Sequence, residues 1–529
     1  MVRKPRGAQE GATPLRAAVI RGKGITATEQ ELVVLAERSF LDLWSYPNPY
    51  RDQKVGGTGD GKELCDLLVV CDPYVLIFSE RNAAWPNRPL EISWSQWFNN
   101  AVFHSAKQTK GAERWLADYP DRVFLDRQCT RTLPIDLPPL DRRVVHRIVV
   151  ARGAGNACRE YFNGGTGSLV VRPDIIGDRH WNRFKYGTVE PFCVGDIDPE
   201  GSFVHVFDDG SLSFVMSELD TITDFTAYLD RKSEFVRSGK LAVAESEEDL
   251  VAYYAVRINE YGDHDFTHPD ERPWSEGERI AISKTFINFI QNPQYTAKKR
   301  ADEISYVWDE LIKKFSGHML DGTSLVPDGH SYDLKQSETA LRYMAKENRF
   351  QRRIHGQAVV GAINIGRSAE HFFFRSMIGA PGSKGNETGF FVLVFPYLDW
   401  MEDQGGYQHY RKKRAEIAVT YGEAMLLQCS HLKRMVGVSL EPPSKDRGSS
   451  EDLLQIEQRD WTPEEQREIK DACKAMGIAQ NFTENQISDQ EFPELEYAPD
   501  ATKQRELGPN RKERRKAKAQ SLKRNQKKR

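Results

Sequence analysis

The sequence predicts a multidomain α/β protein, with an α/β domain at the N-terminus followed by mixed α/β and helical regions. Its 529 residues exceed what one hydrophobic core usually holds, so several domains are expected. Short apolar runs that are typical of buried strands alternate with amphipathic patterns that are typical of helices. Three prolines within residues 134–139 indicate a linker after the first block.

Shifts in composition divide the chain into six expected segments. We expect a disordered basic N-terminus at 1–27, a first α/β domain at 28–133, a second α/β unit at 140–244, a mainly helical region at 245–380, a C-terminal α/β unit at 381–484 and a flexible segment with a basic tail at 485–529.

The first block opens with a helix signal. Thr28 followed by Glu31 has the spacing of a capping box, and apolar residues then recur at helical spacing to about Trp44. Glu37 lies at the edge of this apolar stripe, where a single glutamate is more often a solvated surface residue than a functional one.

Two apolar runs, 64–71 and 74–78, are joined by Asp72-Pro73 and predict a pair of buried antiparallel strands. Asp66 lies inside the first run. An ionised carboxylate there is costly unless it is paired, hydrogen-bonded or bound to a metal. Asp66 is therefore either a structural carboxylate, capping a turn or pairing with a Lys or Arg, or a functional one.

The remaining elements alternate between strands and helices. A helix is expected at about 93–118 and a strand at 121–125; strand 144–150 opens the second unit, and its glycines lack the spacing of a phosphate-binding loop. Further expected elements are a hairpin of strands 203–207 and 212–216, helices at 223–237, 247–256, 275–291, 296–314 and 335–362, a strand–helix–strand unit at 390–395, 410–427 and 435–440, and a helix beginning at Thr462-Pro463.

A triplet of polar residues, Ser79, Glu80 and Arg81, closes the second strand of the first block. A helix carrying a Glu, a strand with an Asp, a strand ending in such a triplet and a further helix together resemble the PD-(D/E)XK nuclease superfamily, the restriction-endonuclease-like fold. The resemblance covers about residues 28–130. It implies phosphodiester hydrolysis with Mg²⁺ or Mn²⁺, in which carboxylates hold the cation and a nearby positive charge stabilises the phosphate.

Carried over by position, the resemblance places Ser79 in the acid position of the motif and Arg81 in the Lys position. Many members keep a polar site residue on the following helix, where this chain has Lys107 and Gln108. The implied catalytic residues are Asp66, Ser79, Glu80, Arg81, Lys107 and Gln108, and the implied metal ligands are Glu37, Asp66 and Glu80.

The chain departs from the family pattern at two positions. Ser79 is a weaker metal ligand than a carboxylate, and Arg81 cannot act as a base because its pKa is too high. Glu80 offers a replacement carboxylate, but strict alternation along a strand directs it to the face opposite Ser79 and Arg81. Only a bulge or a frayed strand end would bring it to their side, and Lys107 is a candidate for the missing lysine.

Charge is distributed unevenly along the chain. Residues 509–529 carry eleven Lys or Arg and one Glu, whereas the rest of the chain is acidic. Such a tail can bind phosphate backbones without sequence selectivity, or serve only as a solvated extension. The candidate nucleic-acid contacts are Arg511, Lys512, Arg514, Arg515, Lys516 and Lys518.

The seven cysteines form no CxxC pair, which predicts reduced thiols and a cytoplasmic location. There is no long apolar run, so no membrane partner is expected. A loop with Asp263, His264, Asp265 and His268 lacks the helical spacing of a metal site and is expected to be solvated.

The leading prediction is a metal-dependent nuclease that acts on DNA or RNA. The first alternative keeps the fold without the chemistry, as a nucleic-acid or protein interaction module, and Ser79 and Arg81 favour it. The second alternative is a structural or adaptor protein in which residues 140–500 carry the partner surface.

Overall fold

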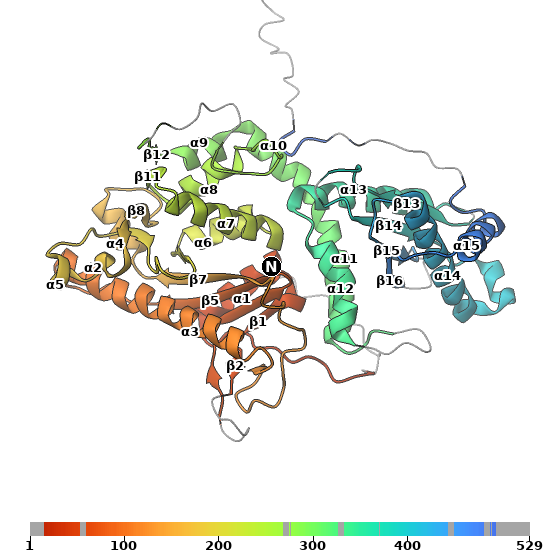
Figure 1. The fold of residues 1–529 in the computed structure, drawn as a ribbon, viewed down its shortest axis with the longest axis horizontal. Helices are drawn as coiled ribbons and strands as arrows, with labels where there is room; N and C mark the ends of the chain where they lie inside the picture. Colours follow the sequence, from red (N-terminus) through yellow and green to blue (C-terminus); the bar gives the residue numbers. More distant parts are fainter. Residues whose placement is uncertain are drawn as a thin grey trace, which may run out of the picture.

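The structure is a computed structural model that describes residues 15–52, 60–267, 275, 277–325, 333–369, 371–383, 385–442, 449–480, 487 and 489–493. It is a multidomain α/β protein, as predicted (Figure 1). Within these ranges, none of the helices has both the length and the apolar character that crossing a bilayer requires. The basic tail lies outside the described residues.

The first sheet has the strand order β1-β4-β5-β7-β10. β1, β4 and β5 form an antiparallel meander, whereas β7 runs parallel to β5 and β10 parallel to β7. Its strands are β1 (Ser45–Pro47), β4 (Leu67–Cys71), β5 (Tyr74–Asn82), β7 (Val144–Arg152) and β10 (Val204–Phe207). The predicted hairpin is confirmed, and Asp66 stands just before β4.

Helices cover both faces of this sheet. Phe40, which ends α1 (Ala27–Ser39), packs against Phe78 of β5 with ring centroids 6.3 Å apart. The next residue of β5, Ser79, donates a hydrogen bond to Gln108 of α3 (His104–Asp118) at 3.1 Å. Because neighbouring residues of a strand point to opposite faces, α1 and α3 lie on opposite sides of the sheet. α2 (Leu90–Phe98) runs into α3 through a π-helical turn at Asn99–Phe103, where one helix was predicted.

The first helix begins earlier than predicted. Its N-cap is Thr26, which accepts a hydrogen bond from the Glu29 backbone N–H at 3.2 Å, and not Thr28. Both threonines have a glutamate three residues later, so the spacing fits either. Gly24, at a φ of +83°, turns the chain directly before Thr26 and sets the start of the helix.

The first sheet extends across the predicted boundary between 133 and 140. β7 pairs with β5 over nine residues, from Tyr74 opposite Val144 to Asn82 opposite Arg152. The first block and the start of the second therefore share one sheet. Residues 15–24, predicted to be disordered, lie along the end of α11 (Tyr306–Leu320): the Val19 backbone N–H donates to the Leu320 carbonyl at 2.7 Å. Residues 1–14 lie outside the described part.

The predicted second strand of a hairpin at 212–216 is wrong, because these residues belong to α6 (Ser211–Glu218). Asp208 Oδ1 accepts the backbone N–H groups of Gly210 and Ser211 and so supports the start of a helix. A short apolar run fits a buried helix as well as a strand.

Three further sheets complete the fold, and one of them lies in a C-terminal unit on the right of Figure 1, where residues of β14 and β15 join the same hydrophobic core as α11 and α13 (Arg349–Gly366). There β14 and β15 are parallel with α14 between them, as predicted, and Thr462 caps α15 as predicted. The elements of that unit are β13 (Phe373–Met377), β14 (Thr388–Val394), α14 (Gly406–Gln428), β15 (Arg434–Leu440), β16 (Glu451–Glu457) and α15 (Pro463–Met476).

The region between the first sheet and that unit contains a small sheet and several helices. The predicted helix 335–362 is two helices, because Asn348 caps a new one. The elements are α4 (Gly155–Tyr161), β8 (Val170–Ile176), α5 (Arg183–Tyr186), β9 (Cys193–Asp196), α7 (Ile222–Arg237), β11 (Leu241–Ala244), α8 (Glu247–Ala255), β12 (Ile280–Ile282), α9 (Thr285–Gln291), α10 (Pro293–Asp302), α12 (Leu334–Ala345) and α13 (Arg349–Gly366); the third sheet consists of β2 (Tyr50–Arg51), β3 (Lys62–Glu63) and β6 (Val123–Phe124).

A buried network of charges joins α11 and α13 to the start of α7. Arg349 donates to Asp220 at 2.7 Å and to Asp309 at 2.8 Å, and Arg352 donates to the other oxygen of Asp309 at 2.7 Å. All four side chains are at most 5% exposed. Two guanidinium groups thus depend on one carboxylate, Asp309, inside the protein.

We expect Asp309→Asn to lower the free energy of unfolding by roughly 3 kcal/mol, since it keeps the shape of the side chain and leaves buried guanidinium charge uncompensated. The measurement is a urea unfolding curve. The matched control is Glu310→Gln on the same helix, whose exposed pair with Lys313 is worth less than about 1 kcal/mol. Equal midpoint shifts in the two variants would contradict this role of Asp309.

Candidate functional site

Four carboxylates gather at one edge of the first sheet. Asp66 stands at the start of β4 and Glu80 near the end of β5, while Glu63 ends β3 and Glu29 lies in the first turn of α1. Asn48, which follows β1, lies among them. We call these residues the acidic cluster.

Asp66 is held by the backbone of β5. The backbone N–H of Glu80 donates to Oδ2 of Asp66 at 2.5 Å, and the N–H of Asp66 donates to the carbonyl of Phe78 at 3.1 Å. Burial raises the pKa of Asp66 to about 7; the bond from the Glu80 backbone opposes this shift, and the charges of the neighbouring glutamates add to it. No Lys or Arg forms an ion pair with Asp66 in the described part of the chain.

Asn48 holds two of the other acids together. Its side-chain amide donates to Glu29 Oε2 at 2.9 Å and to Glu63 Oε1 at 2.7 Å. Burial raises the pKa of Glu63 and the charge of Glu29 adds to this shift, although the bond from Asn48 opposes it. Two carboxylates that share one amide repel each other when both are ionised, and a bound cation would relieve that repulsion.

Glu80 points toward α1. Its side chain accepts a hydrogen bond from Thr28, and its Oε1 lies 3.3 Å from Nε of Arg152 without accepting a hydrogen bond. Arg152 also pairs with Glu31 at 3.0 Å. Burial raises the pKa of Glu80 despite these contacts. Arg152, the last residue of β7, therefore brings positive charge to the acidic cluster from the neighbouring strand.

The described residues contain no group of three or more His, Cys, Asp or Glu side chains that is placed to enclose a metal ion. Mg²⁺ requires less, because it keeps several waters and commonly binds one or two carboxylates together with substrate phosphates. Asp66 and Glu80 belong to adjoining segments of the sheet. Oε1 of Glu80 is buried and accepts no hydrogen bond, and the charge of Glu63 helps to raise the pKa of Asp66. The acidic cluster therefore does not form a closed cage among the described residues, and a Mg²⁺ bound here would be held largely by water.

The structure separates the predicted site residues onto two faces of the sheet. Ser79 donates to Gln108, and Arg81 donates to Asn100 at 2.9 Å, both on the side of α3. Lys107 lies over the Phe103 ring at 4.4 Å on that same side. Glu80 faces α1, as the alternation predicted, so it does not join Ser79, Arg81, Lys107 and Gln108 in one site.

Glu37, predicted as a metal ligand, does not belong to the acidic cluster. Glu37 pairs with Arg21 at 3.0 Å, two turns along α1 from the acidic cluster. The carboxylates that α1 does bring to this edge are Glu29 and Glu31. Glu29 lies in the first turn of the helix and Glu31 in the next, near the end where acidic residues are common for electrostatic reasons alone, so no sequence signal singles them out.

The glycines after β7 do not form a free phosphate loop. The backbone N–H groups of Gly153 and Gly155 both donate to Asp209, at 2.9 and 3.4 Å. A carboxylate of the chain therefore occupies the donors that a phosphate would need, in agreement with the absence of the motif.

Comparisons with known proteins add no relative. The chain matches no protein-family model, no curated protein and no solved structure. The function must therefore be argued from the acidic cluster and the surfaces around it.

We expect Asp66→Asn to stabilise the protein at pH 8 more than at pH 5. The folded pKa of Asp66 lies above its unfolded value of 3.8, so its ionisation destabilises the fold progressively from about pH 4 and fully above about pH 7. The stability difference between variant and wild type should grow by roughly 2 to 3 kcal/mol between pH 5 and pH 8, by urea unfolding without divalent cations. Glu37→Gln is the control and should change by less than about 1 kcal/mol at either pH. A pH-independent effect of Asp66→Asn would show that ionisation of Asp66 does not destabilise the fold.

Proposed function

We propose that the N-terminal domain is a nucleic-acid phosphodiesterase of the PD-(D/E)XK type, with an acid set that differs from the one the motif implied. The observation that carries the proposal is the position of Asp66, joined to the backbone of Glu80 at the sheet edge within a cluster of carboxylates, with its pKa raised to about 7. Strongly perturbed acids gathered at one place are typical of functional sites.

The order of elements supports the proposal. α1 is followed by the meander β1-β4-β5, then by α2 and α3, and then by β7 parallel to β5. This is the order of helix, Asp-bearing strand, triplet-bearing strand and helix on which the resemblance rested. α1 also brings carboxylates to the edge where Asp66 lies, although they are Glu29 and Glu31 and not Glu37.

The residues of the cluster have separable roles in this proposal. Asp66 and Glu80 would hold Mg²⁺, with Glu63 beside them; the bound cation supplies an activated water and neutralises charge on the phosphate. Arg152 offers its guanidinium to the phosphate in place of the missing lysine. Asn48 and Thr28 orient carboxylates of the set by hydrogen bonds.

Exposed aromatic rings and arginines on and near α4 and α5, at the left of Figure 1, support a nucleic-acid partner. Phe184 is 90% exposed there, and Tyr161 and Phe162 are each 46% exposed. Arg159 and Arg179 form no ion pair with the described residues. Exposed rings and unpaired cations together suit stacked bases and a phosphate backbone. The seven free thiols are in keeping with the proposed cytoplasmic location.

A second candidate is an interaction module of the same fold without catalysis. It is favoured by the pairing of Glu80 with Arg152 and by the separation of Ser79 and Arg81 from the acidic cluster. In this case the domain would bind nucleic acid or a protein partner, and the basic tail would add nonspecific affinity that weakens as salt rises.

We expect purified full-length protein to cleave single- or double-stranded DNA or RNA in Mg²⁺ or Mn²⁺, and Asp66→Asn and Glu80→Gln each to lower the rate by about 100-fold or more. Ser79→Ala and Glu37→Gln should retain activity within about threefold, because neither residue belongs to the acidic cluster. Gel-resolved cleavage rates measure this.

The controls decide between the two candidates. Loss of activity in Ser79→Ala but not in Glu80→Gln would place the site on the α3 face and refute the acidic cluster as the catalytic set. Binding of nucleic acid by wild type and by Asp66→Asn, with no cleavage by either, would favour the interaction module.

A further inference from the structure

A short segment near the C-terminus returns from the C-terminal unit to the helical region. α15 lies with the sheet β13-β14-β15-β16, yet residues 489–493 lie against α10 and α13 (Figure 1). The five residues are Asp489, Gln490, Glu491, Phe492 and Pro493. We call them the return segment.

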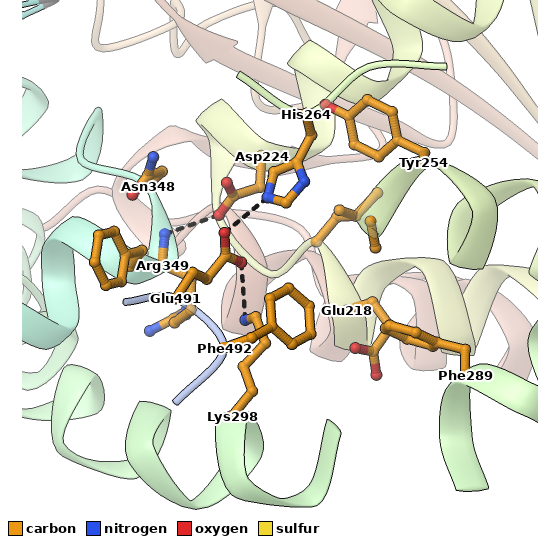
Figure 2. Close-up of a pocket in the computed structure, with 13 residues that line it drawn as sticks. Glu218, Asp224, Tyr254, His264, Phe289, Lys298, Asn348, Arg349, Glu491 and Phe492 are labelled. Atoms are coloured by element: carbon orange, nitrogen blue, oxygen red, sulfur yellow. Dashed lines mark hydrogen bonds and ion pairs between the residues drawn. The ribbon is translucent and has the colours of Figure 1, made fainter. Parts of the chain in front are cut away.

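The side chain of Glu491 enters a pocket between helices that are far apart in the sequence (Figure 2). One carboxylate oxygen lies 2.8 Å from Nε2 of His264, and the other lies 3.3 Å from Nζ of Lys298 on α10. His264 comes from the loop after α8. This loop was predicted to be solvated, but His264 is only 22% exposed because Glu491 covers it. His268 lies outside the described residues.

The backbone of the return segment is also bound. Arg353 of α13, whose side chain is fully buried, donates one N–H to the carbonyl of Glu491 at 3.1 Å and another to the carbonyl of Gln490. Its Nε lies 3.5 Å from Asp489. Carbonyl oxygens that accept from a buried guanidinium are positioned independently of the side chains that follow them, so Arg353 binds the peptide backbone while His264 and Lys298 bind the carboxylate.

The environment favours the ionised form of Glu491. Burial would raise the pKa of Glu491, but the bond and charge of His264 and the charge of Lys298 lower it to about 2. Phe492 lies over Lys298, 5.8 Å from Nζ to the ring centroid. The pocket thus supplies cations for an acidic side chain and a contact for the aromatic side chain that follows it.

We propose that this pocket is a peptide-binding site for an acidic residue followed by an aromatic one, and that the return segment is its resident ligand. Three observations carry this inference: the carboxylate between His264 and Lys298, the backbone carbonyls on Arg353, and the convergence of α10, α13 and the loop after α8 on the return segment. The inference does not depend on the acidic cluster or on nuclease activity.

The test uses the full-length chain and a labelled peptide with the sequence of residues 487–495. In wild type, hydrogen exchange at the return segment should be slow, and the labelled peptide should not bind because the pocket is filled. In Glu491→Lys the segment should exchange about tenfold faster or more, since the carboxylate is replaced by a cation facing His264 and Lys298. The emptied pocket should then bind the labelled peptide, measured by fluorescence anisotropy.

Two controls make the result specific. Glu468→Lys makes the same charge change at an exposed position of α15 and should leave exchange and peptide binding as in wild type. A peptide with Gln in the place of Glu491 should bind the Glu491→Lys chain about tenfold more weakly than the native peptide. Fast exchange of the segment in wild type, or equal binding of the two peptides, would overturn the proposal.

Discussion

The arrangement of the N-terminal half depends on the parallel pairing of β7 with β5. This nine-residue pairing carries the first sheet past the proline-containing stretch and joins residues that are 70 positions apart in the sequence. It also places Arg152, at the end of β7, beside Glu80, at the end of β5. Without that pairing, the acidic cluster would have no guanidinium beside it from β7.

The elements formed by neighbouring residues were largely predictable, and those that depend on distant partners were not. The hairpin around Asp72-Pro73, the strand at 144–150 and the parallel pair β14 and β15 follow from apolar runs and turn residues. The partner of β7 could not be predicted, because an apolar strand fits any sheet edge. The prediction of a strand at residues 212–216 was wrong for a local reason. Five mostly apolar residues carry too little periodicity to separate a helix from a strand.

The candidate site was predictable to the same limited extent. Asp66 was identifiable because an ionised carboxylate beside a buried strand is costly unless it is paired, hydrogen-bonded or bound to a metal. The direction of Glu80 followed from the alternation of side chains along the strand. Glu29, Glu63 and Asn48 belong to polar stretches where such residues are ordinary. Only the fold brings them together, through contacts of 2.7 and 2.9 Å made by one amide. The sequence therefore identified a residue of the site but not the set.

The pKa values of buried carboxylates in this chain are shifted in two directions, and the difference bears on function. Asp309 and Glu491 are each bound by two cationic side chains, which lower their pKa values although burial alone would raise them. Asp66 is surrounded by three other acids, and its pKa is raised instead. Cationic partners are thus available to Asp309 and Glu491 in the same protein. The absence of a cationic partner for Asp66 among the described residues is therefore not shared by every buried carboxylate. Burial and the charge of Asp208 likewise raise the pKa of Glu248 to about 7, so a raised carboxyl pKa occurs at more than one place in the fold, and the proposal of a Mg²⁺ site rests on the position of Asp66 among the other acids of the acidic cluster.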